Sequence, residues 1–149
     1  MALLSKVFEK LEGKKEGRII KEWEFLADDI ITTNPAVSND NSLIVFGAKN
    51  GKIYALDNNG KVKWVYQIKK ELGKEKLFFL EEEKFRQVSA EPAIADLDND
   101  GKDEIVVGSE VGVLFALGFN GSLLWSFSAQ DAIKSSPLIA DINNDKKLE

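Results

Sequence analysis

An internal repeat constrains the fold of this 149-residue chain more than any other feature of its sequence. Residues 43–64 reappear in altered form as residues 104–125, so the second copy lies 61 positions after the first. Each copy has an apolar segment ending in glycine, a second apolar segment behind another glycine, and an Asn-Gly pair shortly before a tryptophan. Similarity at a fixed period indicates a repeat architecture, in which each copy folds as one unit and packs on its neighbours.

The period of the repeat follows from its tryptophans. A tryptophan followed two positions later by an aromatic residue occurs three times, at Trp23, Trp64 and Trp125. The first and the last of these each lie twelve residues before a proline, Pro35 and Pro137, whereas 28 residues separate the middle one from Pro92. About sixteen residues are therefore inserted after the middle copy. Without them the repeat is roughly 45 residues long, the length of a four-stranded propeller blade.

Each repeat reads as a series of short strands separated by turns. Asn-Gly pairs readily take the positive φ angles of tight hairpin turns. Residues 61–66 alternate between polar and apolar, as a half-exposed strand does, whereas Ile105–Val107 are apolar throughout, as in a strand buried on both faces. The sequence predicts strands at Ile19–Phe25, Leu43–Phe46, Lys52–Leu56, Val62–Tyr66, Glu104–Gly108, Val113–Leu117 and Leu123–Phe127. The predicted fold class is all-β, a partial β-propeller of about two to three four-stranded antiparallel blades.

Two segments fall outside this pattern. Residues 2–12 have apolar side chains at helical spacing, which predicts a short amphipathic helix, followed by a polar linker that completes an N-terminal region of residues 1–18. We interpret that helix as a cap on the edge of the domain or a docking element. The propeller region is then residues 19–149, with an insert near residues 68–88. The insert is compatible with either a helical excursion or an extended hairpin.

An acidic loop directly precedes the apolar segment 105–108. Aspartates occupy loop positions 1, 3 and 5, glycine position 6 and glutamate position 9, which is the order of a calcium-binding loop. Ca²⁺ prefers six to eight oxygen ligands, and a glycine at position 6 allows the chain to turn sharply behind the ion. The ligands predicted from this spacing are the side chains of Asp96, Asp98, Asp100 and Glu104 and the backbone carbonyl of Lys102. An EF-hand is excluded, because its twelfth position, a glutamate, is here Val107.

A second acidic loop follows 45 residues later. It retains oxygen donors at positions 1, 3, 5 and 9, and the predicted ligands are Asp141, Asn143, Asp145, Glu149 and the carbonyl of Lys147. Asn143 removes one negative charge, and Lys146 replaces the glycine at position 6, where a positive φ is costly for a residue with a Cβ. We expect this site to be weaker than the first. The corresponding segment of the first repeat, residues 35–43, is shorter and is predicted to be a plain turn.

The composition excludes several kinds of site. The chain contains no cysteine, which rules out disulfides and thiolate metal sites, and no histidine, which removes the commonest general base and metal ligand. The net charge of −5 argues against a nucleic-acid partner, since binding phosphates requires clustered Lys and Arg. The longest apolar runs fall short of the ~18 residues that a transmembrane segment requires. We therefore expect neither a nucleic-acid partner nor a transmembrane segment.

Two families of repeats resemble this sequence. Residues 55–64, Ala-Leu-Asp-Asn-Asn-Gly-Lys-Val-Lys-Trp, resemble the PQQ-like β-propeller repeat, and residues 116–125 resemble it less closely because Gly118 replaces the aspartate. The acidic loop with the strand behind it is similar to the FG-GAP repeat of integrin-type propellers. The resemblance covers about residues 19–149 and implies that the three tryptophans pack between neighbouring blades. It also implies an extracellular or cell-surface location, although the sequence shows no signal peptide.

The function expected from these observations is that of a calcium-binding propeller module, a non-enzymatic interaction scaffold forming part of a larger protein. The expected cofactor is Ca²⁺. The expected partners are another protein or a second copy of the chain, bound through open blade edges, because unpaired strand edges invite pairing. The alternative is that the blades belong to a quinoprotein dehydrogenase-like or polysaccharide-active enzyme. A propeller fold hosts many activities and does not decide between these functions by itself.

Overall fold

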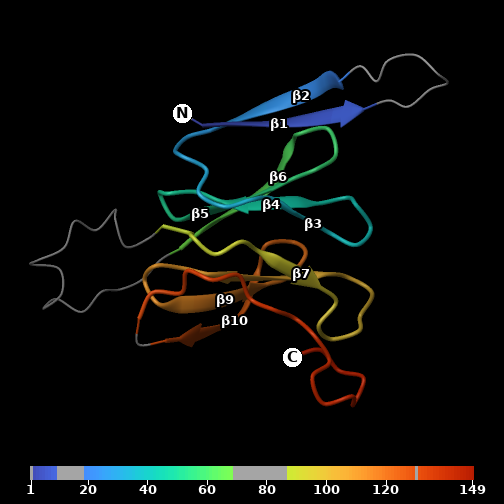
Figure 1. Cartoon of the computed structure of the whole chain (residues 1–149), viewed down its shortest axis with the longest axis vertical. Helices are drawn as coiled ribbons and strands as arrows, with labels where there is room; N and C mark the ends of the chain where they lie inside the picture. Colours follow the sequence, from blue (N-terminus) through green and yellow to red (C-terminus); the bar gives the residue numbers. More distant parts are fainter. Residues whose placement is uncertain (1, 10–18, 69–86, 130) are drawn as a thin grey trace, which may run out of the picture.

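The structure, a computed structural model, describes residues 2–9, 19–68, 87–129 and 131–149. Its strands form three separate antiparallel sheets, which lie one above another in Figure 1. The first sheet is a hairpin of β1 (Ala2–Glu9) and β2 (Ile19–Ala27). The other two sheets have four strands each and follow one another along the chain, as successive blades of a propeller do.

Both four-stranded sheets are meanders in which each strand pairs with the next strand of the sequence. Blade 1 consists of β3 (Ala36–Val37), β4 (Ile44–Gly47), β5 (Lys52–Leu56) and β6 (Val62–Gln67). Blade 2 consists of β7 (Ala93–Ala95), β8 (Glu104–Gly108), β9 (Val113–Leu117) and β10 (Leu123–Ser128). The predicted all-β, partial-propeller fold class is confirmed, and each predicted strand is present. Three of them, Lys52–Leu56, Glu104–Gly108 and Val113–Leu117, have the predicted bounds.

The prediction of an N-terminal helix is wrong. Residues 2–9 form β1, which pairs antiparallel with β2 from Ala2 opposite Ala27 to Glu9 opposite Ile19. The described part of the chain contains no helix. Helical spacing of apolar residues is a local signal, whereas the ladder to β1 supplies hydrogen-bond partners to the backbone of β2, which pairs with no other described strand. This non-local pairing overrides the local preference. Residues 10–18, with most of the predicted linker, lie outside the described residues.

The hydrophobic core lies between the sheets. One cluster joins blade 1 to blade 2, and it includes Val45 from β4 and Leu43 just before it, Ile105 and Val107 from β8, and Phe115 from β9. A second cluster lies between blade 1 and β2. The alternate β4 side chains Ile44 and Phe46 belong to this second cluster, so β4 is buried on both faces. This explains why β4 and residues Ile105–Val107 of β8 are apolar throughout instead of alternating.

Two tryptophans connect neighbouring sheets in the same way. Trp23 of β2 donates its Nε1–H to the carbonyl of Asn58 at 2.7 Å, and its ring lies against Gly60. Trp64 of β6 donates to the carbonyl of Phe119 at 2.9 Å, and its ring lies against Gly121. Each glycine has a positive φ, and a Cβ there would approach the indole to 2.5–2.6 Å. The prediction that tryptophans pack between blades is thus confirmed for these two.

Two further sequence predictions concern the insert and the transmembrane segment. The insert near residues 68–88 lies almost entirely outside the described residues, so its predicted conformations stay open. Within the described ranges, the structure has no helix with the length and apolar character that crossing a membrane requires.

Candidate metal centre

The first acidic loop connects β7, an edge strand of blade 2, to β8, the strand beside it. It leaves β7 after Ala95 and enters β8 at Glu104, whose Cα is paired with that of Ala95. The loop ends are therefore fixed by a strand ladder. Because β8 is fully buried, the residue that begins it is held in place by the core.

Aspartate side chains within the loop accept hydrogen bonds from its own backbone. The carboxylate of Asp96 accepts from the N–H groups of Asp100 at 3.1 Å and Gly101 at 3.0 Å. Asp98 accepts from Asp100 at 3.0 Å, and Asp100 in turn accepts from Lys102 at 2.8 Å. Such local bonds are typical of Asx turns. They curl the loop, and the carboxylates of Asp96 and Asp98 approach that of Glu104.

Three of the five predicted ligands come together. Asp96, Asp98 and Glu104 each offer a carboxylate oxygen, and these three oxygens lie within 4.8 Å of one another. No other group of three or more acidic side chains in the described residues meets the same distance. Asp100 lies outside this trio. The predicted role of the Lys102 carbonyl stays a prediction, as does metal binding itself.

Glu104 is the least accessible carboxylate of the loop, with 5% of its surface exposed. Burial raises the pKa of its carboxyl group, and the charges of Asp98, Asp100 and Asp96 raise it further, whereas the bond that it accepts from the N–H of Leu97 at 2.8 Å lowers it. A buried carboxylate beside like charges is costly to ionise without a cation. Oxygen donors that converge in this way fit the preference of Ca²⁺.

Gly101 turns the chain behind the three carboxylates. Its φ of 86° lies in the left-handed region that favours glycine. No other atom lies within 4 Å of where a Cβ would be, so it is the conformation and not a lack of space that favours glycine here. The loop therefore fits a calcium ion in donor type, in convergence and in backbone shape.

The second acidic loop has the same backbone conformation. Asp141 accepts from the N–H groups of Asp145 at 3.1 Å and Lys146 at 2.8 Å, as Asp96 does in the first loop. Ala140 and Glu149 exchange two backbone hydrogen bonds of 3.1 and 3.0 Å, and so begin a strand pair like that of Ala95 and Glu104. Lys146 has a φ of 68° despite its side chain. The substitution of glycine by lysine therefore does not change the shape of the loop.

The two loops differ in what the final glutamate contacts. Asn143, at position 3 of the second loop, donates its Nδ2–H to the carboxylate of Glu149 at 2.9 Å. In the first loop this position is Asp98, which has no proton to donate to Glu104. Glu149 is also exposed, whereas Glu104 is buried. An amide hydrogen bond thus compensates the carboxylate of the second loop, and that of the first loop lacks this partner.

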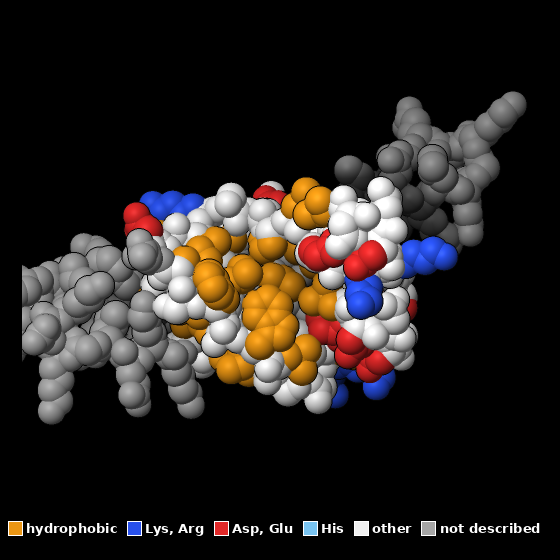
Figure 2. All heavy atoms as spheres, turned by 90° about the horizontal axis from the view of Figure 1, so that it is seen from below, with side chains coloured by type: hydrophobic (Ala, Val, Ile, Leu, Met, Phe, Trp, Pro, Cys, Tyr) orange, Lys and Arg blue, Asp and Glu red, His pale blue; other side chains and the backbone are white. Residues whose placement is uncertain are grey.

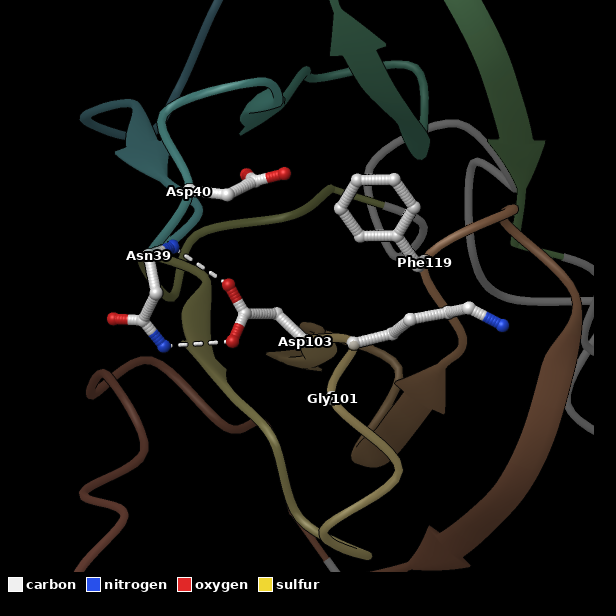
Figure 3. A pocket seen from close by; sticks show the side chains of 6 residues that line it. Asn39, Asp40, Gly101, Asp103 and Phe119 are labelled. Atoms are coloured by element: carbon white, nitrogen blue, oxygen red, sulfur yellow. Dashed lines mark hydrogen bonds between the residues drawn. The ribbon is translucent and has the colours of Figure 1, made fainter.

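A contact between the blades connects the end of the first loop to blade 1. Asp103 is buried, and its carboxylate accepts two hydrogen bonds from Asn39 of blade 1, from the backbone N–H at 2.6 Å and from Nδ2 at 2.7 Å. Figure 3 shows both bonds at the edge of a pocket that Gly101 and Phe119 also line. The sequence alone does not predict this pair. Asn39 lies in the segment interpreted as a plain turn, and no local pattern connects residues 64 positions apart.

Comparisons with known proteins support the propeller architecture. A family model described as the lambda-carrageenase beta-propeller domain matches residues 90–147, which include blade 2 and most of the second acidic loop. That match covers less than half of the chain. No curated protein matches the sequence.

The solved structures that resemble the fold include the following three. BamB from Moraxella catarrhalis has a TM-score of 0.60 and 23% identity, over 81% of this chain and 31% of that one. The WD40 repeats of RRP9 have a TM-score of 0.53 and 22% identity, and U3-55K has 0.53 and 21%, each over 72% of this chain and 29% of the other. The chain thus spans less than a third of the length of each. These similarities identify a partial β-propeller, and at such identities they show the fold alone.

Proposed function

We propose that this chain is a calcium-binding β-propeller module that serves as a non-enzymatic interaction scaffold. The convergence of the Asp96, Asp98 and Glu104 oxygens on one point carries the proposal. One calcium ion there would neutralise carboxylates that otherwise repel one another, and would fix the connection between β7 and β8. The role of the ion is thus structural. It stabilises a blade whose other strands present the surfaces for a partner.

We also propose that the repeats are of the FG-GAP and PQQ-like types. The acidic loop entering a buried strand supports an FG-GAP type of repeat, and the Asn-Gly turn that receives a tryptophan from the neighbouring sheet supports a PQQ-like type. The absence of histidine and cysteine from the sequence limits the available acid–base and nucleophilic groups, which supports a role without catalysis.

Thermal unfolding with excess calcium and with a chelator tests the calcium site. A ligand that binds only the folded chain stabilises it by about 2.7 kcal/mol at a concentration of 100 Kd. We expect a higher Tm with calcium in the wild type. Asp96→Ala should abolish this difference, because Asp96 is both a ligand candidate and the acceptor that shapes the loop.

Asp141→Ala is the matched control, since Asp141 makes the same backbone contacts in the second loop. This variant should retain most of the calcium effect. Magnesium should substitute poorly, because its small octahedral shell does not suit a site made mostly of protein oxygens. Equal melting temperatures of the wild type in calcium and in chelator would refute the calcium site.

The match of residues 90–147 to a carrageenase propeller domain favours a second candidate function, a module of a polysaccharide-active enzyme. In that case the chain should bind or depolymerise carrageenan. The assay is the release of reducing ends, together with retention of the chain on immobilised polysaccharide. Activity in the isolated chain would exclude the non-enzymatic proposal.

A further inference from the structure

The sequence contains three Asn-Gly pairs, and all three lie in turns of the same backbone conformation. Their glycines are Gly51, Gly60 and Gly121, with φ angles of 77°, 76° and 80°. In each turn the glycine N–H donates to the carbonyl three residues earlier, at 3.1, 3.0 and 2.8 Å. The asparagines before these glycines therefore differ in their side-chain contacts and not in the course of the backbone.

The asparagine side chain is hydrogen-bonded in two of these turns. Asn120 accepts at its Oδ1 from the N–H and the hydroxyl of Ser122, at 3.0 and 2.7 Å. Asn50 accepts at its Oδ1 from the N–H of Lys52 at 3.1 Å and donates its Nδ2–H to Asp28 at 2.9 Å. In both turns the asparagine itself accepts from the residue after the glycine.

In the turn between β5 and β6 an aspartate takes this role. The carboxylate of Asp57 accepts from the backbone N–H of Asn59 at 2.9 Å and from that of Lys61 at 3.0 Å. The residue in this position is Ala48 in the first turn and Gly118 in the third, and neither has a side-chain acceptor. The Asn59 side chain is thus left exposed, with no hydrogen bond among the described residues.

An asparagine side chain without hydrogen-bond partners can react with the nitrogen of the following glycine. This nitrogen attacks the side-chain carbonyl carbon and closes a succinimide ring, and the N–H proton leaves with the amide nitrogen as ammonia. Water then opens the ring at either of its carbonyl groups. One product is aspartate, and the other is isoaspartate, whose backbone runs through the former side chain and gains a methylene group. Glycine favours ring closure because it has no Cβ beside the attacking nitrogen.

The place of Asn59 gives this reaction a structural consequence. The carbonyl of Asn58 accepts from Nε1 of Trp23 at 2.7 Å, and the Trp23 ring lies against Gly60. These contacts join β2, and with it the β1–β2 hairpin, to blade 1. Isoaspartate would place an additional methylene group between the Asn58 carbonyl and Gly60, the two points that Trp23 contacts.

We propose that Asn59 is a site of spontaneous deamidation, and that the isoaspartate formed there releases Trp23 from blade 1. The attack requires a local opening of the turn, and each side-chain bond that must break makes this opening rarer. Asn50 and Asn120 each have two such bonds, whereas Asn59 has none among the described residues. The turn is thus a slow chemical switch for the attachment of the first sheet. It does not involve calcium, so it is independent of the function proposed above.

Peptide mapping by mass spectrometry, during incubation of the whole chain at mildly alkaline pH, tests the site. Asn59 should deamidate at least about fivefold faster than Asn50 or Asn120, which is the factor that one ordinary hydrogen bond corresponds to. The control is Asn59→Gln, which should stay unmodified because glutamine would have to close a larger ring. A rate at Asn59 no higher than the rates at the other two asparagines would overturn the proposal.

Asp57→Ala tests why Asn59 reacts. This variant copies Ala48 of the first turn and makes the N–H of Lys61 available to the Asn59 side chain. Deamidation of Asn59 should then slow by about fivefold. An unchanged rate at Asn59 in the folded variant would show that Asp57 does not govern the reaction, and would overturn this explanation.

Gly118→Asp is the reverse exchange in blade 2. A Cβ at Gly118 would lie 3.2 Å from the hydroxyl of Ser122, a side chain that can move aside. The new carboxylate should take the N–H of Ser122 from Asn120, so deamidation of Asn120 should become faster. An unchanged rate at Asn120 would count against the exchange of acceptors. If neither variant folds, the ranking of the three asparagines in the wild type still decides.

Hydrogen exchange of the indoles tests the release of the first sheet. In the isoaspartate form, separated by chromatography, the Nε1–H of Trp23 should exchange at least about fivefold faster, and Tm should fall. Trp125 is the reference, because it is already 46% exposed on β10, at the end of the molecule where hydrophobic side chains gather in Figure 2. Asn59→Asp adds the charge without the methylene group and should keep Trp23 protected. Isoaspartate at position 59 with unchanged Trp23 exchange would overturn the release.

Discussion

The acidic loops 96–104 and 141–149 share one backbone conformation, but they differ in how the charge of the final glutamate is compensated. In both, the aspartate at position 1 accepts from two backbone N–H groups, and the glutamate at position 9 accepts from the residue after position 1. In the second loop the Asn143 amide donates to Glu149. In the first loop three carboxylate oxygens face one another without such a donor.

The shape of such a loop and its capacity to bind a cation depend on different residues. Hydrogen bonds from side chains to the backbone produce the same shape with glycine or lysine at position 6. The residue at position 3 then decides the charge, because an amide can satisfy the neighbouring carboxylate and an aspartate cannot. We therefore expect the first loop to require a cation and the second to be stable without one.

The largest effect is expected when the first loop is given the amide of the second. In Asp98→Asn, the new amide can donate to Glu104, and one anionic ligand is lost. A tenfold weaker affinity would lower the stabilisation by calcium from about 2.7 to about 1.4 kcal/mol at the concentration that gives 100 Kd in the wild type. In chelator the variant should be at least as stable as the wild type, because repulsion is relieved. Calorimetric titration and Tm in both conditions measure the change, and an undiminished calcium effect would contradict it.

A second difference between the loops is the residue at position 8, Asp103 in the first and Leu148 in the second. Asp103→Leu removes two hydrogen bonds from Asn39, and with them a polar contact between the blades. We expect a loss of about 1 kcal/mol in the free energy of unfolding, measured in denaturant with and without calcium. Asp103→Asn retains an acceptor and should cost less. Equal losses in the two variants would show that charge, and not hydrogen bonding, connects the blades.

The third prediction concerns position 6. Gly101→Lys copies Lys146 into the first loop, where there is room for the side chain but φ is 86°. The left-handed conformation costs a residue with a Cβ roughly 1 kcal/mol, part of which is offset by the reduced entropy of the unfolded chain. We expect a loss of about 0.5 kcal/mol with the calcium effect retained. Gly101→Asn should cost less, because Asn tolerates this conformation. Loss of calcium binding in Gly101→Lys would show that glycine does more than shape the turn.

Most of the fold could be predicted from the sequence because its signals are local and repeated. Strands β5, β8 and β9 begin and end where apolar runs meet glycine or a turn, so their bounds could be read from the sequence. The very short β3 and β7 leave no periodic signal over two or three residues. The helix predicted for residues 2–12 failed because pairing with β2 is a non-local contact that no window of sequence contains.

The candidate site was predictable in part for the same reason. Spacing predicted which carboxylates converge, but it included Asp100, which lies outside the trio. The sequence also predicted that Lys146 would weaken the second loop, because a positive φ is costly for a residue with a Cβ. The structure gives Lys146 a positive φ while Asp141 accepts from its backbone N–H. The amide bond between Asn143 and Glu149 depends on side-chain positions, and the spacing of residues does not specify those.

The smallest effect is expected for the reverse exchange, Asn143→Asp, which gives the second loop the charge of the first. It removes the amide donor from Glu149 and adds a fourth carboxylate to a loop whose final residue is exposed. Repulsion among exposed charges is weak, so in chelator we expect a loss of only a few tenths of a kcal/mol. With calcium, a second and weaker binding event should appear in calorimetric titration.

Asp98→Asn combined with Asn143→Asp is the decisive variant, because it moves the charge from one loop to the other. If position 3 alone made the site, this double variant would bind calcium as tightly as the wild type. We expect weaker binding, because the core holds Glu104 in place and Glu149 has no such support.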